Sequence, residues 1–178
     1  VVADYNVRAL VRSDRAAQTL DKAAADEVRI VDYTSESAMT RALEGCIGAV
    51  HLVGIIRENH NSTYVNAHEN ATRALCHAAE VTGVRKVVYL SILGASVNST
   101  NACLSSKARA ERILTESSVS SSILRVPMVL GTNDHAARAL AKRASSTIAF
   151  AFRASSLEQP IDVDDVIAAV IACMESSI

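Results

Sequence analysis

Short apolar runs alternate with longer helical segments along most of the chain, and this alternation limits the folds that it can adopt. The runs are apolar at consecutive positions, as expected for parallel strands that are covered by helices on both faces. Two of the helical segments end at a glycine, Gly45 or Gly83. Strands are predicted at 6–12, 27–32, 49–54, 85–91 and 121–127, and helices at 13–25, 35–45, 62–83 and 101–114. The sequence therefore predicts an α/β fold with a doubly wound parallel sheet.

After Gly131 the alternation becomes looser. A helix is predicted at 134–144, a short apolar run at 147–152, and a last helix within 159–174 that Asp162 or Asp164 can cap. We therefore divide the chain into residues 1–131, which carry the regular alternation of strands and helices, and residues 132–178, a shorter C-terminal part that completes the sheet.

Composition excludes several classes of protein. The net charge of −1 gives no basic excess for binding nucleic acid, and no apolar run reaches the roughly 18 residues of a membrane span. The four cysteines, Cys46, Cys76, Cys103 and Cys173, are widely spaced, so we expect reduced thiols in a cytoplasmic protein. The five histidines are also scattered, and no metal site is expected.

Seven segments carry a resemblance to a known family. They are "NVRALVRSD", "HLVGIIRE", "VNAHENATRAL", "VRKVVYLSILGA", "LSSKARAE", "ILRVPMVLG" and "QPIDVDDV". Their order resembles that of atypical and extended short-chain dehydrogenases/reductases, especially the NAD-dependent epimerase-like and NmrA-like branch and relatives of the complex I accessory subunit of this fold. The resemblance implies a Rossmann-like sheet, a nicotinamide dinucleotide, a small-molecule substrate, and a homodimer or larger assembly.

The resemblance assigns cofactor contacts to the ends of the first two predicted strands. Arg12, with Ser13 and Arg15 nearby, matches the basic position that meets the 2′-phosphate of NADP. The resemblance therefore implies a preference for NADP(H) over NAD(H) as the cofactor. A solvated surface arginine is the alternative. Asp32 and Tyr33 match the position along the adenine, and the alternative for Asp32 is a turn or cap residue.

Further assignments follow at the later strands. Leu52, Val53 and Gly54 match the loop beside the cofactor ribose, where glycine allows close approach. Ser91 matches the catalytic Ser or Thr, with a serine that satisfies its own loop backbone as the alternative. Pro127 matches the proline beside the nicotinamide.

The family's Tyr-x-x-x-Lys pair is replaced here by Cys103 and Lys107. In the family the tyrosine hydroxyl transfers the proton, while the lysine lowers the pKa of that hydroxyl and holds the ribose. A cysteine thiol has a suitable intrinsic pKa of about 8.5. Its sulfur, however, lies an aromatic ring closer to the backbone than a tyrosine hydroxyl. We therefore expect Cys103 to be a doubtful acid and Lys107 to contact a ribose.

A second departure concerns the start of the chain. The family begins with a strand and a glycine-rich turn that holds the pyrophosphate at a helix N-terminus. None of the six glycines here follows a first strand, and "VVADYN" matches the end of the first helix. The family's strand order of 3-2-1-4-5-6 would then leave 6–12 and 49–54 with open edges facing each other. We expect a truncated chain, direct pairing of these two strands, or closure by a partner.

Three functions remain open on this evidence. The first is an NAD(P)-binding protein that is catalytically weak or inactive because of Cys103. The second is an active NADP-dependent oxidoreductase or sugar-nucleotide epimerase. The third is a scaffold or accessory subunit that binds no nucleotide.

Overall fold

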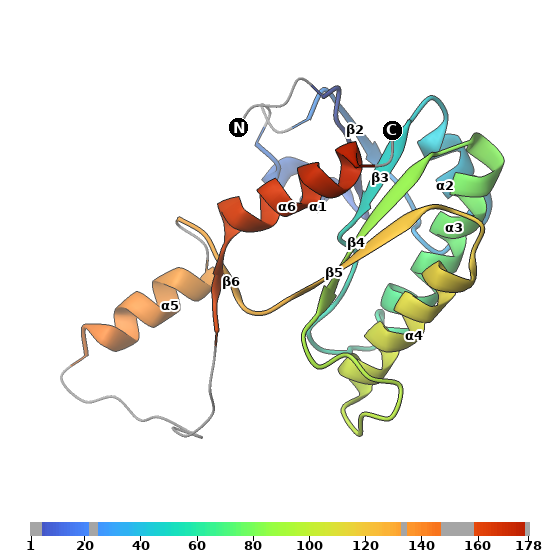
Figure 1. The fold of residues 1–178 in the computed structure, drawn as a ribbon. Coiled ribbons are helices and arrows are strands. Elements are labelled where there is room, and N and C mark those ends of the chain that lie inside the picture. The colour runs from blue at the N-terminus through green and yellow to red at the C-terminus, as the bar shows by residue number, and fades with distance from the viewer. Residues whose placement is uncertain (1–4, 22–24, 133–134, 147–158, 177–178) are drawn as a thin grey trace.

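Seven strands and six helices, with one π-helical segment, make up the part of the chain that the structure describes (Figure 1). The structure is a computed structural model, and it describes residues 5–21, 25–132, 135–146 and 159–176. The strands are β1 (Arg8–Val11), β2 (Glu27–Ile30), β3 (Gly48–His51), β4 (Lys86–Ile92), β5 (Ser121–Val126), β6 (Val129–Leu130) and β7 (Ile161–Asp162). The helices are α1 (Asp14–Thr19), α2 (Glu36–Leu43), η1 (Val65–Asn70), α3 (Ala71–Thr82), α4 (Ala102–Glu116), α5 (His135–Ala144) and α6 (Val163–Glu175).

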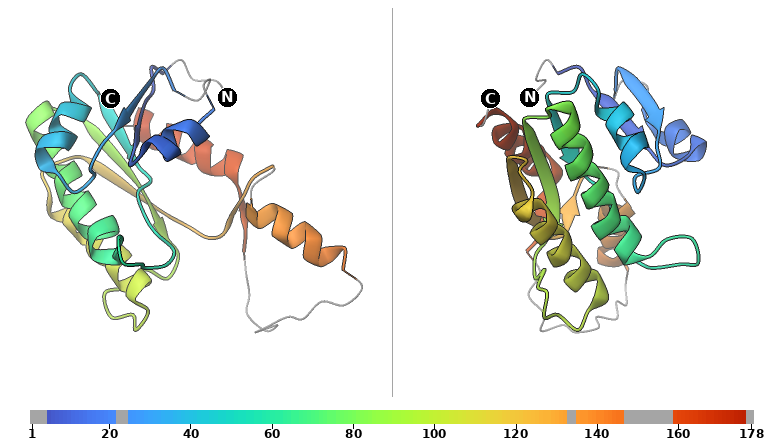
Figure 2. Two further views of the ribbon diagram at one scale, coloured as in Figure 1. Left: turned by 180° about the vertical axis from the view of Figure 1, so that it is seen from behind. Right: turned by 90° about the vertical axis from the view of Figure 1, so that its right-hand side faces the viewer.

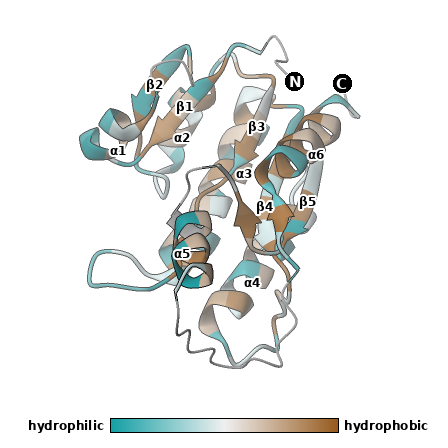
Figure 3. Ribbon diagram, turned by 90° about the vertical axis from the view of Figure 1, so that its left-hand side faces the viewer, coloured by the Kyte–Doolittle hydropathy of each residue, from teal (hydrophilic) through white to brown (hydrophobic). Residues whose placement is uncertain are grey.

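The centre of the fold is a parallel ladder of three strands in the order β3-β4-β5. Its middle strand is buried on both faces, because Val87, Val88 and Tyr89 are all 0% exposed. This burial explains the consecutive apolar residues of "KVVYL" and confirms the predicted parallel sheet. Figure 3 shows the hydrophobic colour concentrated along β4.

Helices cover both faces of this ladder, as a doubly wound fold requires. Helices α3 and α4 lie on one face and α6 lies on the other (Figure 2). One face of α3 is buried, including Ala74, Leu75 and Ala78, and joins the main core with α2 and the strands. Met174 of α6 lies over Gly48 so closely that a Cβ at Gly48 would come within 2.2 Å of the Met174 Cε atom.

A second parallel ladder contains only β1 and β2. In the described residues β1 pairs with β2 alone and β3 pairs with β4 alone, so the expected direct pairing of 6–12 with 49–54 is wrong. Apolar side chains are exposed on both ladders, including Val28 and Ile30 on β2 and Val50 on β3.

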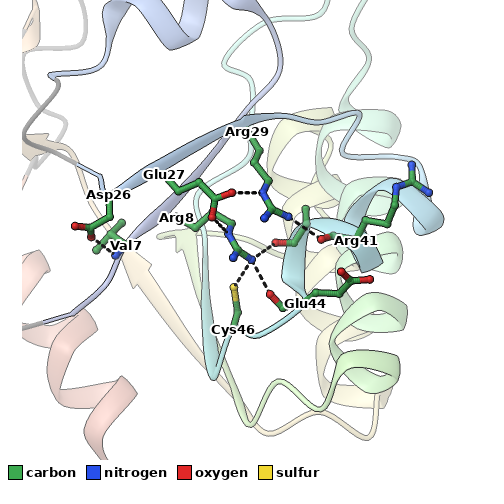
Figure 4. Close-up of polar contacts among 9 residues, drawn as sticks. Val7, Arg8, Asp26, Glu27, Arg29, Arg41, Glu44 and Cys46 are labelled. Carbon is green, nitrogen blue, oxygen red and sulfur yellow. Dashed lines mark hydrogen bonds and ion pairs between the residues drawn. The ribbon is translucent and has the colours of Figure 1, made fainter.

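Arg8 joins the small ladder to the rest of the fold (Figure 4). Its guanidinium donates to Glu27 at 2.5 Å and to the carbonyl oxygens of Ala42 and Glu44, both at 2.8 Å. It also contacts the Cys46 Sγ atom at 3.3 Å. The last carbonyls of α2, which have no partner within the helix, are thereby satisfied by a side chain from β1.

Local signals located most helix ends correctly. Ser35 caps α2, Asp162 caps α6, and Gly83 ends α3 with a φ of 75° in the left-handed region that favours glycine. The helix predicted at 13–25 is shorter, because α1 ends at Thr19. The helix predicted at 62–83 begins with the π-helical turn η1, and the segment at 159–174 contains β7 before α6. The predicted run at 147–152 lies outside the described residues.

In the described residues, none of the helices is long and apolar enough to cross a membrane. Helix α5 lies away from the central ladder in Figure 1.

Candidate functional site

Lys107 occupies the centre of a group of side chains at the carboxyl end of β4. It comes from the second turn of α4, whose first turn is capped by the Asn101 side chain. The Lys107 Nζ atom donates to the Leu90 carbonyl oxygen at 3.1 Å and lies 4.6 Å from the centre of the Tyr89 ring. Burial lowers the pKa of Lys107 to about 8. No carboxylate forms an ion pair with Lys107 in the described part of the chain.

Gly54 passes directly beside this ammonium group. A Cβ atom built on Gly54 would lie 3.3 Å from Lys107 Nζ and 3.4 Å from the His68 Nε2 atom. The loop after β3 and helix α4 therefore meet at a point where a larger side chain would press on a cation and a buried ring. This contact joins two of the residues that were predicted from separate segments of the sequence.

Cys103 lies one turn before Lys107, as the four-residue spacing predicts. Its Sγ atom is 3.9 Å from the Ile55 carbonyl oxygen, so the thiol faces the same loop. Burial raises the pKa of the Cys103 thiol, although the Lys107 charge acts in the opposite direction. The thiol is therefore protonated at neutral pH and is a poor proton acceptor.

Ser91 lies within β4, one residue before the end of that strand. It is 3% exposed, and its Oγ atom has no hydrogen-bond partner in the described residues. The alternative that Ser91 satisfies its own loop backbone is therefore wrong. The Tyr89 hydroxyl is buried without a described partner as well.

The residues predicted at the end of β1 lie on the smaller ladder. Arg12 and Arg15 are exposed, whereas Ser13 accepts a hydrogen bond from the Ala16 N–H at 3.3 Å and caps α1. Ser13 thus has a structural role as a helix cap.

Asp32 and Tyr33, at the end of β2, also make local contacts. An Asp32 carboxylate oxygen accepts from the Thr34 N–H at 2.9 Å and from the Thr34 hydroxyl at 2.7 Å. These bonds lower the pKa of Asp32 and agree with the turn-residue alternative. The Tyr33 hydroxyl donates to the Leu10 carbonyl oxygen at 3.0 Å and ties the ends of the two strands together.

Of the remaining predicted residues, Leu52 is 66% exposed, while Val53 and Pro127 are half-buried.

A cavity of about 330 Å³ lies beside the turn after Asp32. It is lined by Thr34, Glu36, Asn66, Asn70, Arg73 and Ala74.

Two buried histidines near Lys107 were missed as site residues. His51 on β3 is 5% exposed, stacks on Tyr89 with ring centres 5.0 Å apart, and forms a 2.9 Å hydrogen bond with Thr72. His68 on η1 is 0% exposed. One signal was available, since His68 precedes Ala71 by three residues and Leu75 by seven and so extends the apolar face of that helix.

Solved structures with the same fold come from several bacterial proteins. The enzyme WbmG from Bordetella bronchiseptica, in complex with NAD and UDP, has a TM-score of 0.78 at 15% identity, over 97% of this chain and 62% of that chain. Pen from Bacillus thuringiensis has a TM-score of 0.76 at 19% identity, over 96% of this chain and 57% of that chain. An NADPH-dependent quinone oxidoreductase from Escherichia coli, complexed with NADPH, has a TM-score of 0.59 at 26% identity, over 80% of this chain and 46% of that chain.

The chain thus spans less than two thirds of the length of these structures. A search of curated proteins gives no match. The family model described as NAD(P)H-binding, in contrast, matches residues 1–175, which is nearly the whole chain. Together with the Rossmann-like parallel sheet and the Lys107 site, this match shows that the chain belongs to the NAD(P)H-binding family.

Proposed function

We propose that the chain binds a nicotinamide dinucleotide along the carboxyl ends of its parallel strands, and that it transfers protons weakly or not at all. The observation that supports this best is the Lys107 ammonium beside Gly54. Of its three N–H groups, one donates to the Leu90 carbonyl. The others can donate to the paired hydroxyls of a ribose that approaches the Gly54 backbone.

The bound cofactor would extend from this point across both ladders. Leu52, Val53 and Gly54 would follow the ribose, and Pro127 would lie beside the nicotinamide. Asp32 and Tyr33 would lie along the adenine. The exposed Arg12 and Arg15 would meet a 2′-phosphate next to the capped start of α1, which favours NADP(H). Residues 132–178 would complete the substrate side.

Weak catalysis follows from the chemistry of Cys103. The cofactor would supply hydride transfer, and a carbonyl substrate then needs a proton donor at its oxygen. The Cys103 thiol is shorter than a tyrosine side chain and faces the Ile55 carbonyl oxygen. It is therefore badly placed to act as the family's tyrosine does.

One observation favours a second candidate, an active NADP-dependent oxidoreductase or epimerase acting on a small substrate. The buried Ser91 Oγ atom has no hydrogen-bond partner in the described residues, and a substrate oxygen would supply one. In this candidate Ser91 orients the substrate, and Lys107 acts through the cofactor ribose.

Titration of the purified chain with NADPH and NADH, followed by nicotinamide fluorescence, tests the proposal. We expect both to bind, and we expect Arg12→Ala to weaken NADPH about tenfold more than NADH, because a phosphate dianion loses a charge-assisted donor. Arg112→Ala is the matched control, since Arg112 lies on α4 and forms an exposed ion pair with Glu116. Absence of binding by either nucleotide would contradict the proposal and favour a scaffold role.

The same protein, assayed on a panel of carbonyl substrates, separates the two candidates. We expect little turnover by the natural chain and a gain in Cys103→Tyr. Rapid turnover that survives Cys103→Ala would instead establish the second candidate, with an acid other than the thiol.

A further inference from the structure

The fully buried His68 side chain bonds directly to the backbone of the loop that follows β3 beside Lys107. The Ile55 N–H donates to the His68 Nε2 atom at 3.2 Å. The His68 ring also stacks on Tyr64, with ring centres 5.5 Å apart. Ile55 follows Gly54, so this bond fixes the backbone at the position where a Cβ would touch both His68 and Lys107.

The direction of this bond determines the protonation state of the ring. Because a backbone N–H can only donate, the Nε2 atom must carry a lone pair, and in the neutral ring the proton is on Nδ1. Burial and the Lys107 charge lower the pKa of His68 to about 4. The ring is therefore neutral at pH 7 and able to accept the bond.

The π-helical turn explains how this ring reaches the loop. Two consecutive residues of η1 are buried, His68 toward the loop after β3 and Glu69 toward α4, where it accepts from Ser106 and Arg109. A widened turn that directs neighbouring residues to two different partners is typical of π-helical segments at functional sites.

The position of His68 is fixed from the sheet as well. The Thr72 hydroxyl donates to the His68 carbonyl oxygen at 2.5 Å. Thr72 can then accept from the Nε2–H group of His51 at 2.9 Å. A chain of hydrogen bonds thus runs from β3 through α3 and η1 to the Gly54–Ile55 backbone.

We propose that His68 is a positioning residue for the cofactor site: it holds the Gly54–Ile55 backbone against Lys107, so that the loop is ordered before a nicotinamide dinucleotide binds. This inference rests on the proposed function and adds to it a residue outside the family's Ser, Tyr and Lys set. The benefit is entropic, because a loop that is already fixed loses less freedom on binding.

The test compares His68→Leu, which removes the acceptor at similar volume, with His68→Gln, whose amide oxygen can accept at nearly the same place as Nε2. His77→Leu is the matched control, because His77 is exposed on α3. We expect His68→Leu to weaken NADH and NADPH about tenfold, and His68→Gln and His77→Leu to stay within about twofold of the natural chain.

Amide hydrogen exchange provides a readout that general destabilisation would not reproduce. In His68→Leu the Ile55 amide should exchange at least tenfold faster, while the amide of Ala79, buried in α3, should be unchanged. Equal exchange at Ile55 in the natural chain and in His68→Leu would overturn the inference even if cofactor binds. If the natural chain binds no nucleotide, the proposed function fails and the role in binding fails with it, whereas the exchange result still decides whether His68 holds the loop.

Discussion

At the scale of single residues, Lys107 shows what a sequence pattern can and cannot predict. Its place on a helix after β4 follows from local spacing, and so does the position of Cys103 one turn earlier. The environment of the ammonium does not follow from spacing, because Gly54, Leu90 and Tyr89 come from other elements. Burial among these groups is what lowers the pKa of Lys107.

This lowered pKa predicts a particular dependence on pH. The pKa of Lys107 is about 8 in the folded chain and 10.5 in the unfolded chain, so the unfolded state binds more protons between these values. The contribution of Lys107 to stability should therefore rise with pH from 8 to about 10.5, and this contribution should be missing from the profile of Lys107→Met. Cofactor affinity should change in the opposite direction, falling above pH 8 as the ammonium loses a proton that it donates to the ribose.

Denaturant unfolding at pH 7.5, 8.5 and 9.5, with fluorescence titration at the same pH values, measures both effects. Identical pH profiles for the natural chain and Lys107→Met would show that the lysine is not buried as described.

At the scale of elements, the join between η1 and α4 depends on one buried carboxylate. Glu69 is 7% exposed and accepts from the Ser106 hydroxyl at 3.0 Å and from the Arg109 Nε atom at 2.9 Å. A sequence pattern could not predict that Glu69 is buried and accepts from residues of α4. A glutamate in a helix is usually solvated, and only the widened turn directs Glu69 inward together with His68.

We therefore expect Glu69→Ala to destabilise the fold by about 1–3 kcal/mol, because Ser106 and Arg109 lose a charged acceptor. Arg109 remains half-exposed and can be hydrated, which keeps the loss below that of a fully buried pair. Glu116→Ala is the control: its pair with Arg112 is exposed on α4, so its removal should leave the free energy of unfolding nearly unchanged. Equal effects in urea unfolding would contradict the structural role of Glu69.

At the scale of the whole molecule, the parts that could be predicted are those that local signals determine. Strands β1 to β5 were located, and so were the caps at Gly83 and Asp162, because each is encoded by neighbouring residues, whereas the two-residue strand β6 (Val129–Leu130) was not predicted. The separation of β1 from β3 was expected only as one of three outcomes and only through the resemblance, because strand pairing depends on contacts distant in sequence and local signals could not decide between open edges and direct pairing. Arg8 illustrates the difference: it lies in a predicted strand, yet its guanidinium satisfies the end of α2 more than thirty residues away.

The two buried histidines lead to a prediction for the stability of the whole fold in acid. Burial lowers the pKa of His51 to about 3 and that of His68 to about 4, against 6.5 in an unfolded chain. The unfolded state therefore binds more protons below pH 6.5, so stability is fully present above that value and is lost as the pH falls toward 4. Each histidine contributes a slope of at most about 1.4 kcal/mol per pH unit.

The window between pH 6.5 and 4.5 isolates these residues from the carboxylates. Glu27 and Glu80 have pKa values lowered from 4.5, and Asp32 has a pKa lowered from 3.8, so their contributions are lost only at still lower pH. Urea unfolding at pH 7, 6, 5.5 and 5 should show a falling free energy of unfolding, with about half that slope in His68→Gln. A flat profile over this window would mean that the rings are charged or hydrated in the fold, and the buried hydrogen-bond chain from β3 to Ile55 could not then exist as described.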